Sequence, residues 1–137
     1  MPPSPSIAEV TVMQAVSNPP VAATPIPGIR HATLAGSAQG IRDLSVWSQV
    51  LEPGASTPPH RHRCNEVVMC MAGRGEVHLP GKRISFGADS TVCLPRNELH
   101  QIVNTGTEPL HLIAVFGQSP VEVFLPDGST LELPWSS

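Results

Sequence analysis

The chain lacks the features that nucleic-acid-binding and membrane-spanning proteins use. It contains no tyrosine, 3 phenylalanines and 2 tryptophans, too few aromatic faces to form a platform for stacked bases. Lys and Arg number 8 against 11 Asp and Glu, so no basic surface attracts nucleic acid or anionic lipid. The longest apolar runs, such as residues 112–116, are far shorter than the roughly 20 residues of a membrane helix. We therefore expect neither a nucleic-acid partner nor a membrane segment.

Cysteine is also scarce. The chain has three, Cys64, Cys70 and Cys93, and an odd number leaves at least one unable to pair within the chain. The stretch from Met1 to Pro5 has neither the positive start nor the apolar core of a secretory signal peptide. Free thiols without a secretory segment are typical of a reducing compartment. We therefore expect a cytoplasmic protein.

The distribution of proline divides the chain into two parts. A chain of 137 residues is long enough for one domain with its own core. Seven of the 16 prolines lie in residues 1–27, and they exclude a long helix there. We interpret residues 1–27 as an extended arm, either partly disordered or lying on a partner subunit, and residues 28–137 as the folded domain.

From residue 28 onward, short apolar or alternating runs are separated by Gly, Pro, Asn and Asp. This pattern predicts strands over residues 44–51, 66–71, 76–79, 90–94, 101–104, 110–116 and 121–125. Asp127-Gly128 suits the tight turn of a hairpin near the end of the chain. No window has the periodicity of a convincing amphipathic helix. We therefore predict an all-β sandwich or barrel.

Three histidines and one glutamate stand out at strand-compatible spacing. His60 and His62 flank a single residue, so on a strand both point to the same face. Glu66 follows four residues later, and His100 shares a face with Ile102 on a later strand. Three imidazoles and a carboxylate suit Zn, Mn, Fe, Ni or Cu better than Ca or Mg. The sequence therefore predicts one mononuclear divalent metal inside the barrel, held by His60, His62, Glu66 and His100.

These residues resemble the two motifs of the cupin family. The pattern Gly54-x5-His60-x-His62-x3-Glu66-x6-Gly73 matches the first cupin motif at every fixed position. The second motif is matched by Pro95, His100 and Asn104, but Gly87 lies two residues further from Pro95 than usual and Asn97 replaces a glycine. The resemblance implies a double-stranded β-helix, also called a jelly-roll barrel, and metal at the four positions named above. It also implies subunits paired through their sheets, so we expect a homodimer.

Within the cupins, the chain resembles the plant auxin-binding protein family. The resemblance is carried by residues 31–36, 46–47 and 53–67, and it extends over roughly residues 28–126. It implies zinc on the three histidines and the glutamate, a ligand carboxylate on the zinc, and a pocket lined by Trp47, Thr57 and Pro58. The chain departs from the family in lacking an endoplasmic-reticulum retention tetrapeptide. The family's C-terminal helix, whose aromatic side chain contacts the ligand, is shortened or missing, with Trp135 as a weak substitute.

Three functions are compatible with this metal site. The first is binding without turnover of a small carboxylate-bearing molecule, possibly an aromatic one, at an open coordination position. The shortage of acid and base groups favours it, because Glu66 is the one carboxylate predicted inside. The second is a cupin enzyme, namely a dioxygenase, decarboxylase or isomerase acting on a small carboxylate or enolate. The third is a purely structural metal. Zinc is the expected ion, with manganese, iron or nickel as alternatives.

Other residues have competing interpretations. Trp47 is either a wall of the pocket or a core residue. Glu98 is either a proton shuttle at the mouth of the barrel or a solvated loop residue, and the second is favoured. Asn104 orients either a neighbouring loop or His100. Cys93, at the end of a predicted strand, is expected in the core.

Overall fold

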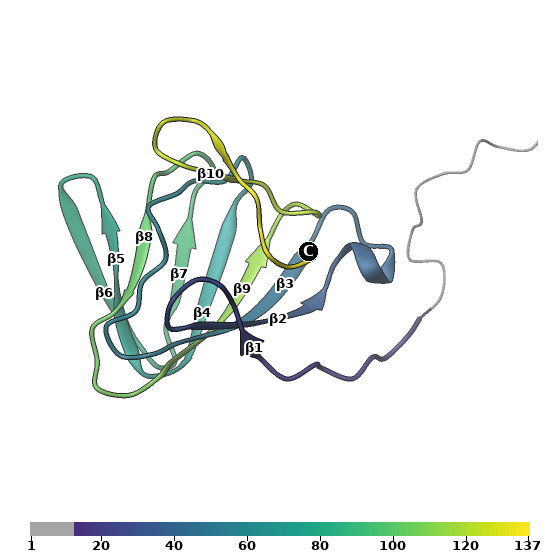
Figure 1. The fold of residues 1–137 in the computed structure, drawn as a ribbon, viewed down its shortest axis with the longest axis horizontal. Helices are drawn as coiled ribbons and strands as arrows, with labels where there is room; N and C mark the ends of the chain where they lie inside the picture. Colours follow the sequence, from purple (N-terminus) through teal and green to yellow (C-terminus); the bar gives the residue numbers. More distant parts are fainter. Residues whose placement is uncertain (1–12) are drawn as a thin grey trace, which may run out of the picture.

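The computed structural model describes residues 13–137 and shows a barrel of two facing sheets (Figure 1). The first part of the predicted arm, residues 1–12, lies outside the described residues. The strands are β1 (Ala22–Ala23), β2 (Ile29–Ala35), β3 (Ser45–Leu51), β4 (Glu66–Ala72), β5 (Arg74–Leu79), β6 (Lys82–Gly87), β7 (Thr91–Leu94), β8 (Gln101–Asn104), β9 (Leu110–Phe116), β10 (Val123–Phe124) and β11 (Thr130–Leu131). Among the described residues, the helical structure consists of one 3-10 turn, η1 (Ser37–Gln39). The expected all-β class is confirmed.

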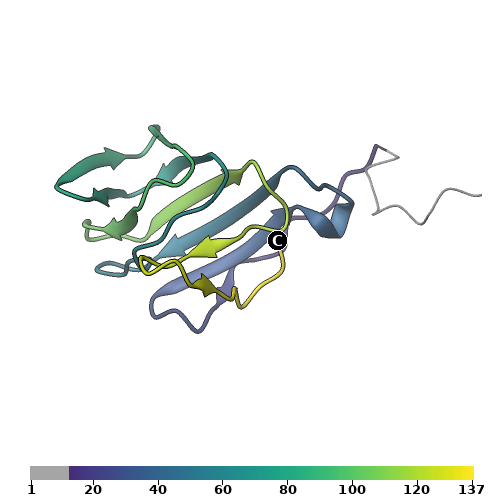
Figure 2. The ribbon, with the colours of Figure 1, turned by 90° about the horizontal axis from the view of Figure 1, so that it is seen from above.

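The larger sheet has the strand order β1-β2-β3-β9-β4-β7, and the smaller one has the order β6-β5-β8. Strand β9 lies in the middle of the larger sheet, with Trp47 of β3 opposite Ala114 on one side and Glu66 of β4 opposite Phe116 on the other. Figure 2 shows these strands running alongside one another. Residues far apart in the sequence are thereby brought to one wall of the barrel.

The core lies between the two sheets because alternate residues of the strands point inward. Along β9, Leu110, Leu112, Ala114 and Phe116 are buried, and the residues between them are half-buried on the opposite face. Val77 and Ile102 face them from the smaller sheet and are also buried. The inward-facing positions are the ones on which a site inside the barrel depends.

The short hairpin β10–β11 closes one side of the barrel. Val123 pairs with Leu131 and Phe124 with Thr130, on either side of the turn that contains Asp127 and Gly128. The predicted hairpin at this turn is therefore observed. Phe124 is also joined by two backbone hydrogen bonds of 2.9 Å to Arg61, which ties the hairpin to the segment between β3 and β4.

The described part of the predicted arm has two regions. Residues 13–20 are all exposed and extend away from the barrel (Figures 1 and 2). Ala22 and Ala23 pair with β2 at the edge of the larger sheet, and Ile26 packs against the core. Residues 22–27 thus lie on the barrel itself. No helix in residues 13–137 has the length and apolar character needed to cross a membrane.

Cys93 was expected in the core, but the structure places it in an exposed position. It lies opposite Val67 in the pairing of β7 with β4, and Val67 belongs to the half-buried outer set of β4. The inward positions of β7 are instead Val92, which packs against the core, and Leu94, which is buried. The prediction was wrong because side chains alternate between the two faces of β7, and Cys93 lies on the outer face between two inward-facing residues.

Candidate metal centre

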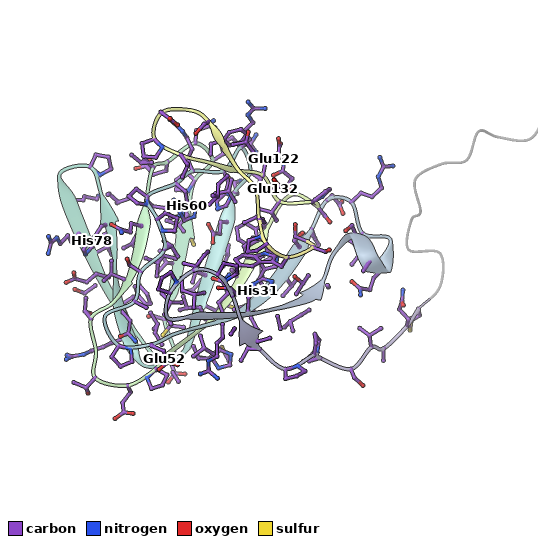
Figure 3. All side chains as sticks on the ribbon, in the orientation of Figure 1. His31, Glu52, His60, His78, Glu122 and Glu132 are labelled. Carbon is purple, nitrogen blue, oxygen red and sulfur yellow. The ribbon has the colours of Figure 1, made fainter. Side chains whose placement is uncertain are left out.

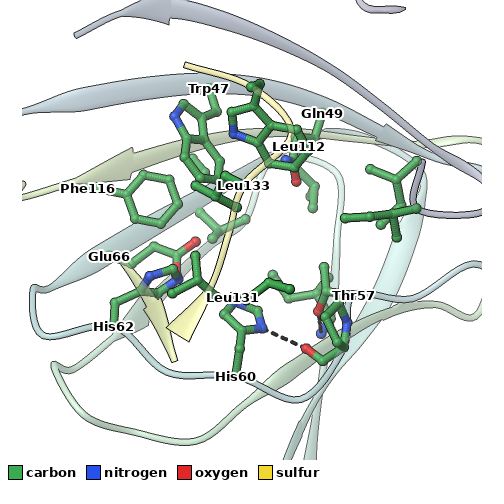
Figure 4. Close-up of a pocket in the computed structure, with 18 residues that line it drawn as sticks. Trp47, Gln49, Thr57, His60, His62, Glu66, Leu112, Phe116, Leu131 and Leu133 are labelled. Atoms are coloured by element: carbon green, nitrogen blue, oxygen red, sulfur yellow. Dashed lines mark hydrogen bonds and ion pairs between the residues drawn. The ribbon is translucent and has the colours of Figure 1, made fainter. Parts of the chain in front are cut away.

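Three histidines and a glutamate converge inside the barrel. His60 and His62 lie between β3 and β4, Glu66 begins β4, and His100 immediately precedes β8. All four side chains are buried, and their potential ligand atoms lie within 4.8 Å of one another. His60 and His100 are held together by a pair of backbone hydrogen bonds of 2.9 Å. The structure therefore brings together all four residues that the sequence singled out. Figure 3 shows His60 inside the barrel, and Figure 4 shows His60, His62 and Glu66 close together.

Each histidine ring is oriented by a backbone carbonyl. The Nδ1 atoms donate to the carbonyl oxygens of residues on three different segments: His60 to Pro58 (2.6 Å), His62 to Glu122 (2.8 Å) and His100 to Glu98 (2.9 Å). Because a carbonyl oxygen can only accept, Nδ1 carries the proton in all three rings. The lone pair of each neutral imidazole is then on Nε2, as metal-ligating histidines require.

The remaining atoms of the cluster have the arrangement that a metal ion needs. The Nε2 atoms of His62 and His100 and Oε1 of Glu66 are buried without a hydrogen-bond partner. Both Nε2 atoms lie 3.4 Å from Oε1 of Glu66. Two ligands of a tetrahedral zinc ion, each at about 2.1 Å, are separated by about 3.4 Å. These orphaned atoms and their spacing fit a single divalent ion held by His60, His62, Glu66 and His100.

Burial and mutual contact set the charge of the cluster. Burial, together with the charges of His100 and His62, lowers the pKa of His60 to about 4. Burial also lowers the pKa of His62. For Glu66, burial raises the pKa, but contact with His100 and the neighbouring histidines outweighs it, so its pKa lies below the ordinary value. Glu66 therefore stays ionised at neutral pH and supplies the site with a negative charge.

His100 behaves differently from the other two histidines. Burial alone would lower its pKa. The contact with the Glu66 carboxylate has the opposite and larger effect, so the pKa of His100 lies above the ordinary value. In the absence of a metal, a positive charge on His100 thus compensates the negative charge of Glu66. The buried carboxylate therefore has a partner of opposite charge.

A small cavity adjoins three of the four side chains, those of His60, His62 and Glu66. Its volume is about 50 Å³, and the predicted pocket residues Trp47, Thr57 and Pro58 all line it (Figure 4). Trp47 is 4% exposed and packs against Phe116, so it belongs both to the core and to the wall of the cavity. The hydroxyl of Thr57 accepts a 3.0 Å hydrogen bond from the backbone N–H of Ile102, which fixes its place beside the smaller sheet.

Most of the far wall of the cavity was not predicted from the sequence. Leu131, Leu133 and Trp135 line it from the end of the chain. Trp135 stacks on His31 with ring centroids 3.9 Å apart and meets Trp47 edge-on at 5.3 Å. The apolar alternation at residues 131, 133 and 135 was the signal that could have indicated this wall.

A chain of hydrogen bonds holds this wall in place. The amide of Gln49, which also lines the cavity, donates to Nδ1 of His31 at 3.0 Å, so Nε2 of His31 donates to the Thr33 hydroxyl at 2.8 Å. The Thr33 hydroxyl in turn donates to the carbonyl of Ser136 at 2.6 Å. Burial lowers the pKa of His31 to about 4, which keeps its ring neutral. The segment carrying Trp135 is thereby fixed to β2.

Two further residues of the second motif are explained by the backbone. Asn104 is buried and donates to the carbonyls of Leu51 and Glu108, both at 2.9 Å, so it orients a neighbouring loop, not His100. Asn97, which replaces a glycine, has φ +66°, a left-handed conformation that asparagine tolerates better than most residues. The carboxylate of Glu98 is exposed, and only its carbonyl oxygen contacts the cluster.

A double-stranded β-helix with three histidines and one glutamate in its interior defines the cupin class. The Cupin 2 conserved barrel domain protein from Salinispora arenicola superposes with a TM-score of 0.63 at 28% identity, over 75% of this chain and 89% of that one. The polyketide cyclase RemF from Streptomyces resistomycificus has a TM-score of 0.67 at 22% identity, over 91% of this chain and 89% of that one, which concerns the fold alone. The expected jelly-roll barrel is confirmed.

Within this class the chain belongs to the auxin-binding protein family. The family model described as Auxin binding protein matches residues 2–135. Auxin-binding protein 1 from Arabidopsis thaliana is 38% identical over 109 residues, which cover 72% of this chain and 55% of the relative. The chain thus matches little more than half the length of that relative. The resemblance stated from the sequence is confirmed at the level of the family.

Proposed function

We propose that this protein binds a small carboxylate-bearing molecule through one divalent metal ion, with zinc as the resident ion. His60, His62, Glu66 and His100 would hold the metal, and the bound metal would offer an open coordination position to an anionic oxygen. The body of the ligand would rest on Trp47 and the neighbouring apolar side chains.

The composition of the cavity wall carries this proposal. Among the described residues that line the cavity, the ionisable side chains are His60, His62 and Glu66, all members of the metal cluster. The other lining residues are apolar, apart from the neutral Gln49 and Thr57. General acid or base catalysis needs a titratable group free to exchange a proton with the ligand. A wall without such a group favours binding over turnover.

The size of the cavity restricts the ligand. A volume of about 50 Å³ holds a carboxylate and few further atoms. A ring-sized body therefore requires side chains of the C-terminal wall, such as Leu133 and Trp135, to shift. The names of the relatives, which are auxin-binding proteins, support an acidic small molecule as the ligand.

The first measurement is the metal content of tag-free, natively purified protein by elemental mass spectrometry. We expect near-stoichiometric zinc. Calorimetry with acetate, phenylacetate and indole-3-acetate should then show binding that phenylacetamide, which lacks the carboxylate, does not show. In His62→Ala, metal content and acid binding should both be lost, while circular dichroism remains that of a folded barrel.

Several outcomes would contradict the proposal. Full metal occupancy in His62→Ala would show that the ligand set is wrong. Stoichiometric iron, manganese or nickel, together with oxygen uptake or loss of the added acid, would favour the alternative of a metal-dependent cupin enzyme. A protein that contains no metal, and takes up none on titration, would contradict the central claim of the proposal, that the ligand binds through a metal ion.

A further inference from the structure

A second hollow adjoins the metal cavity. It is a groove of about 650 Å³, lined by residues of the segments 25–27, 56–58 and 131–134 together with Gln101. We call it the proline groove, because four prolines belong to its wall: Pro25, Pro27, Pro58 and Pro134. Four residues line both the groove and the cavity: Ile26, Thr57, Pro58 and Leu131. The two hollows therefore share one wall.

The two volumes indicate how a ligand divides between the hollows. Sites for small molecules typically have volumes of about 300–1,000 Å³. The groove falls within this range, whereas the cavity, at about 50 Å³, holds a carboxylate and few further atoms. An unbranched chain is the narrowest continuation of a carboxylate, so it makes the smallest demand on the shared wall.

The metal centre and the groove are joined at Pro58. This residue lines both hollows, and its carbonyl oxygen accepts the 2.6 Å hydrogen bond from Nδ1 of His60 (dashed line in Figure 4). The preceding residue, Thr57, is fixed by two hydrogen bonds with Ile102. Its N–H donates to the Ile102 carbonyl at 2.9 Å, and its hydroxyl accepts from the Ile102 N–H at 3.0 Å. A chain that leaves the metal along Thr57 and Pro58 therefore enters the groove directly.

The end of the predicted arm forms another wall of the groove. The Thr24 hydroxyl donates to the carbonyl of Ile29 at 2.8 Å and accepts from the N–H of Ile26 at 3.1 Å. On either side of Ile26, Pro25 and Pro27 have the restricted φ angle of proline. Proline rings have almost no side-chain entropy to lose. Covering this wall with a ligand therefore costs little in ordering the protein.

Charge determines which way round an acid lies. Among the described residues that line the groove, Glu132 is the ionisable one, and its side chain is exposed. The groove therefore offers a carboxylate no cation, and Glu132 repels it. The apolar wall instead suits an aliphatic chain, whose burial is favourable in proportion to its area. The carboxylate accordingly belongs at the metal, and the chain belongs in the groove.

We propose that the ligand is an elongated monocarboxylic acid whose unbranched apolar chain passes Thr57 and Leu131 and lies in the proline groove. This inference rests on the proposed function, because the metal ion anchors the carboxylate. It adds the class of acid and a second subsite, to which the arm contributes residues 25–27.

Calorimetry with butanoate, hexanoate and octanoate on tag-free protein loaded with zinc tests the length of the ligand. The Kd should fall by about two- to fourfold for each added methylene, since a groove open on one side buries part of each group. Octanedioate, whose second carboxylate would lie in the groove with Glu132, should bind more weakly than octanoate. Glu132→Gln should reduce this difference.

Two matched substitutions test the place of the chain. Ser56 lines the groove but not the cavity, so Ser56→Phe should fill the groove and make the affinities for octanoate and butanoate similar. The control is Ser85→Phe, at an exposed position in the same row of the smaller sheet, separated from Ser56 by Val103 and Glu76. It should retain the full gain with chain length. Zinc content, butanoate affinity and circular dichroism should be unchanged in both variants.

A second variant keeps the test decisive if Ser56→Phe fails to fold. Pro134→Phe narrows the groove from the C-terminal segment and should have the same effect on octanoate. Butanoate binding that depends on zinc but does not strengthen along the series would overturn the groove and leave the proposed function intact. A gain that survives both substitutions, or octanoate binding that persists in His62→Ala, would also overturn the groove. Absence of zinc-dependent binding of every acid would overturn both proposals.

Discussion

Replacing Glu66 with glutamine tests the metal centre most directly. The substitution keeps the shape of the side chain but removes the charge that Glu66 supplies at 3.4 Å from both His62 and His100. Loss of a residue that merely supports a metal ligand costs about 10- to 100-fold in affinity, so loss of a charged ligand should cost at least about 100-fold.

The loss of metal affinity in Glu66→Gln can be measured as a smaller stabilisation of the folded chain by added metal. At a metal concentration of about 100 times the wild-type Kd, binding stabilises the fold by about 2.7 kcal/mol. At the same concentration, a variant with 100-fold weaker binding gains about 0.4 kcal/mol. The metal-induced increase in Tm should therefore be smaller in Glu66→Gln by roughly 5 to 12 °C.

Thermal and urea unfolding with and without added zinc provide the assay. The matched control is Glu122→Gln, which removes an equal charge from an exposed side chain whose backbone carbonyl accepts from His62. We expect this control to retain the full stabilisation by zinc. If Glu66→Gln retained it as well, the assignment of Glu66 as a ligand would be refuted.

Three further predictions concern the surroundings of the site. Asn104→Ala leaves two backbone carbonyls without donors, so urea unfolding should show a loss of about 2 to 4 kcal/mol, with unchanged zinc content. His31 has a pKa of about 4 in the folded chain and an ordinary value of 6.5 when unfolded. As pH falls from 6.5 toward 4, only the unfolded chain takes up this proton. The free energy of unfolding should then fall by up to about 1.4 kcal/mol per pH unit relative to His31→Gln. Trp135→Ala should enlarge the cavity and raise the affinity for indole-3-acetate relative to that for acetate, measured by calorimetry.

The sequence predicted the inner strands better than the edges. Strands β3, β4, β8 and β9 were expected close to their observed bounds because each is a short apolar or alternating run bounded by turn residues. Strand β6 was missed because four of its residues, 82–85, are exposed and include Lys and Arg, as is common at a sheet edge. Strand β2 was missed because His31 takes an inward position that is normally apolar.

The four residues of the metal cluster could be found from the sequence, because His60 and His62 share a face and Glu66 follows four residues later. His100 was added from a later predicted strand, and all four match the cupin motifs. For the wall formed by residues 131–135, the apolar alternation indicates an inward face but not which part of the barrel that face meets. The wall is placed by contacts such as the stacking of Trp135 on His31, and these two residues are separated by about a hundred positions in the chain. A local pattern does not identify so distant a partner.

The hydrogen bonds that orient the histidines also imply an order of assembly during synthesis. His60 and His100 receive their carbonyl partners from residues 58 and 98, but His62 depends on the carbonyl of Glu122, which emerges later from the ribosome. The far wall comes later still, with Leu133 and Trp135. All four candidate metal donors therefore precede in the chain the residues that close the cavity, so a growing chain contains the complete donor set before it contains the far wall.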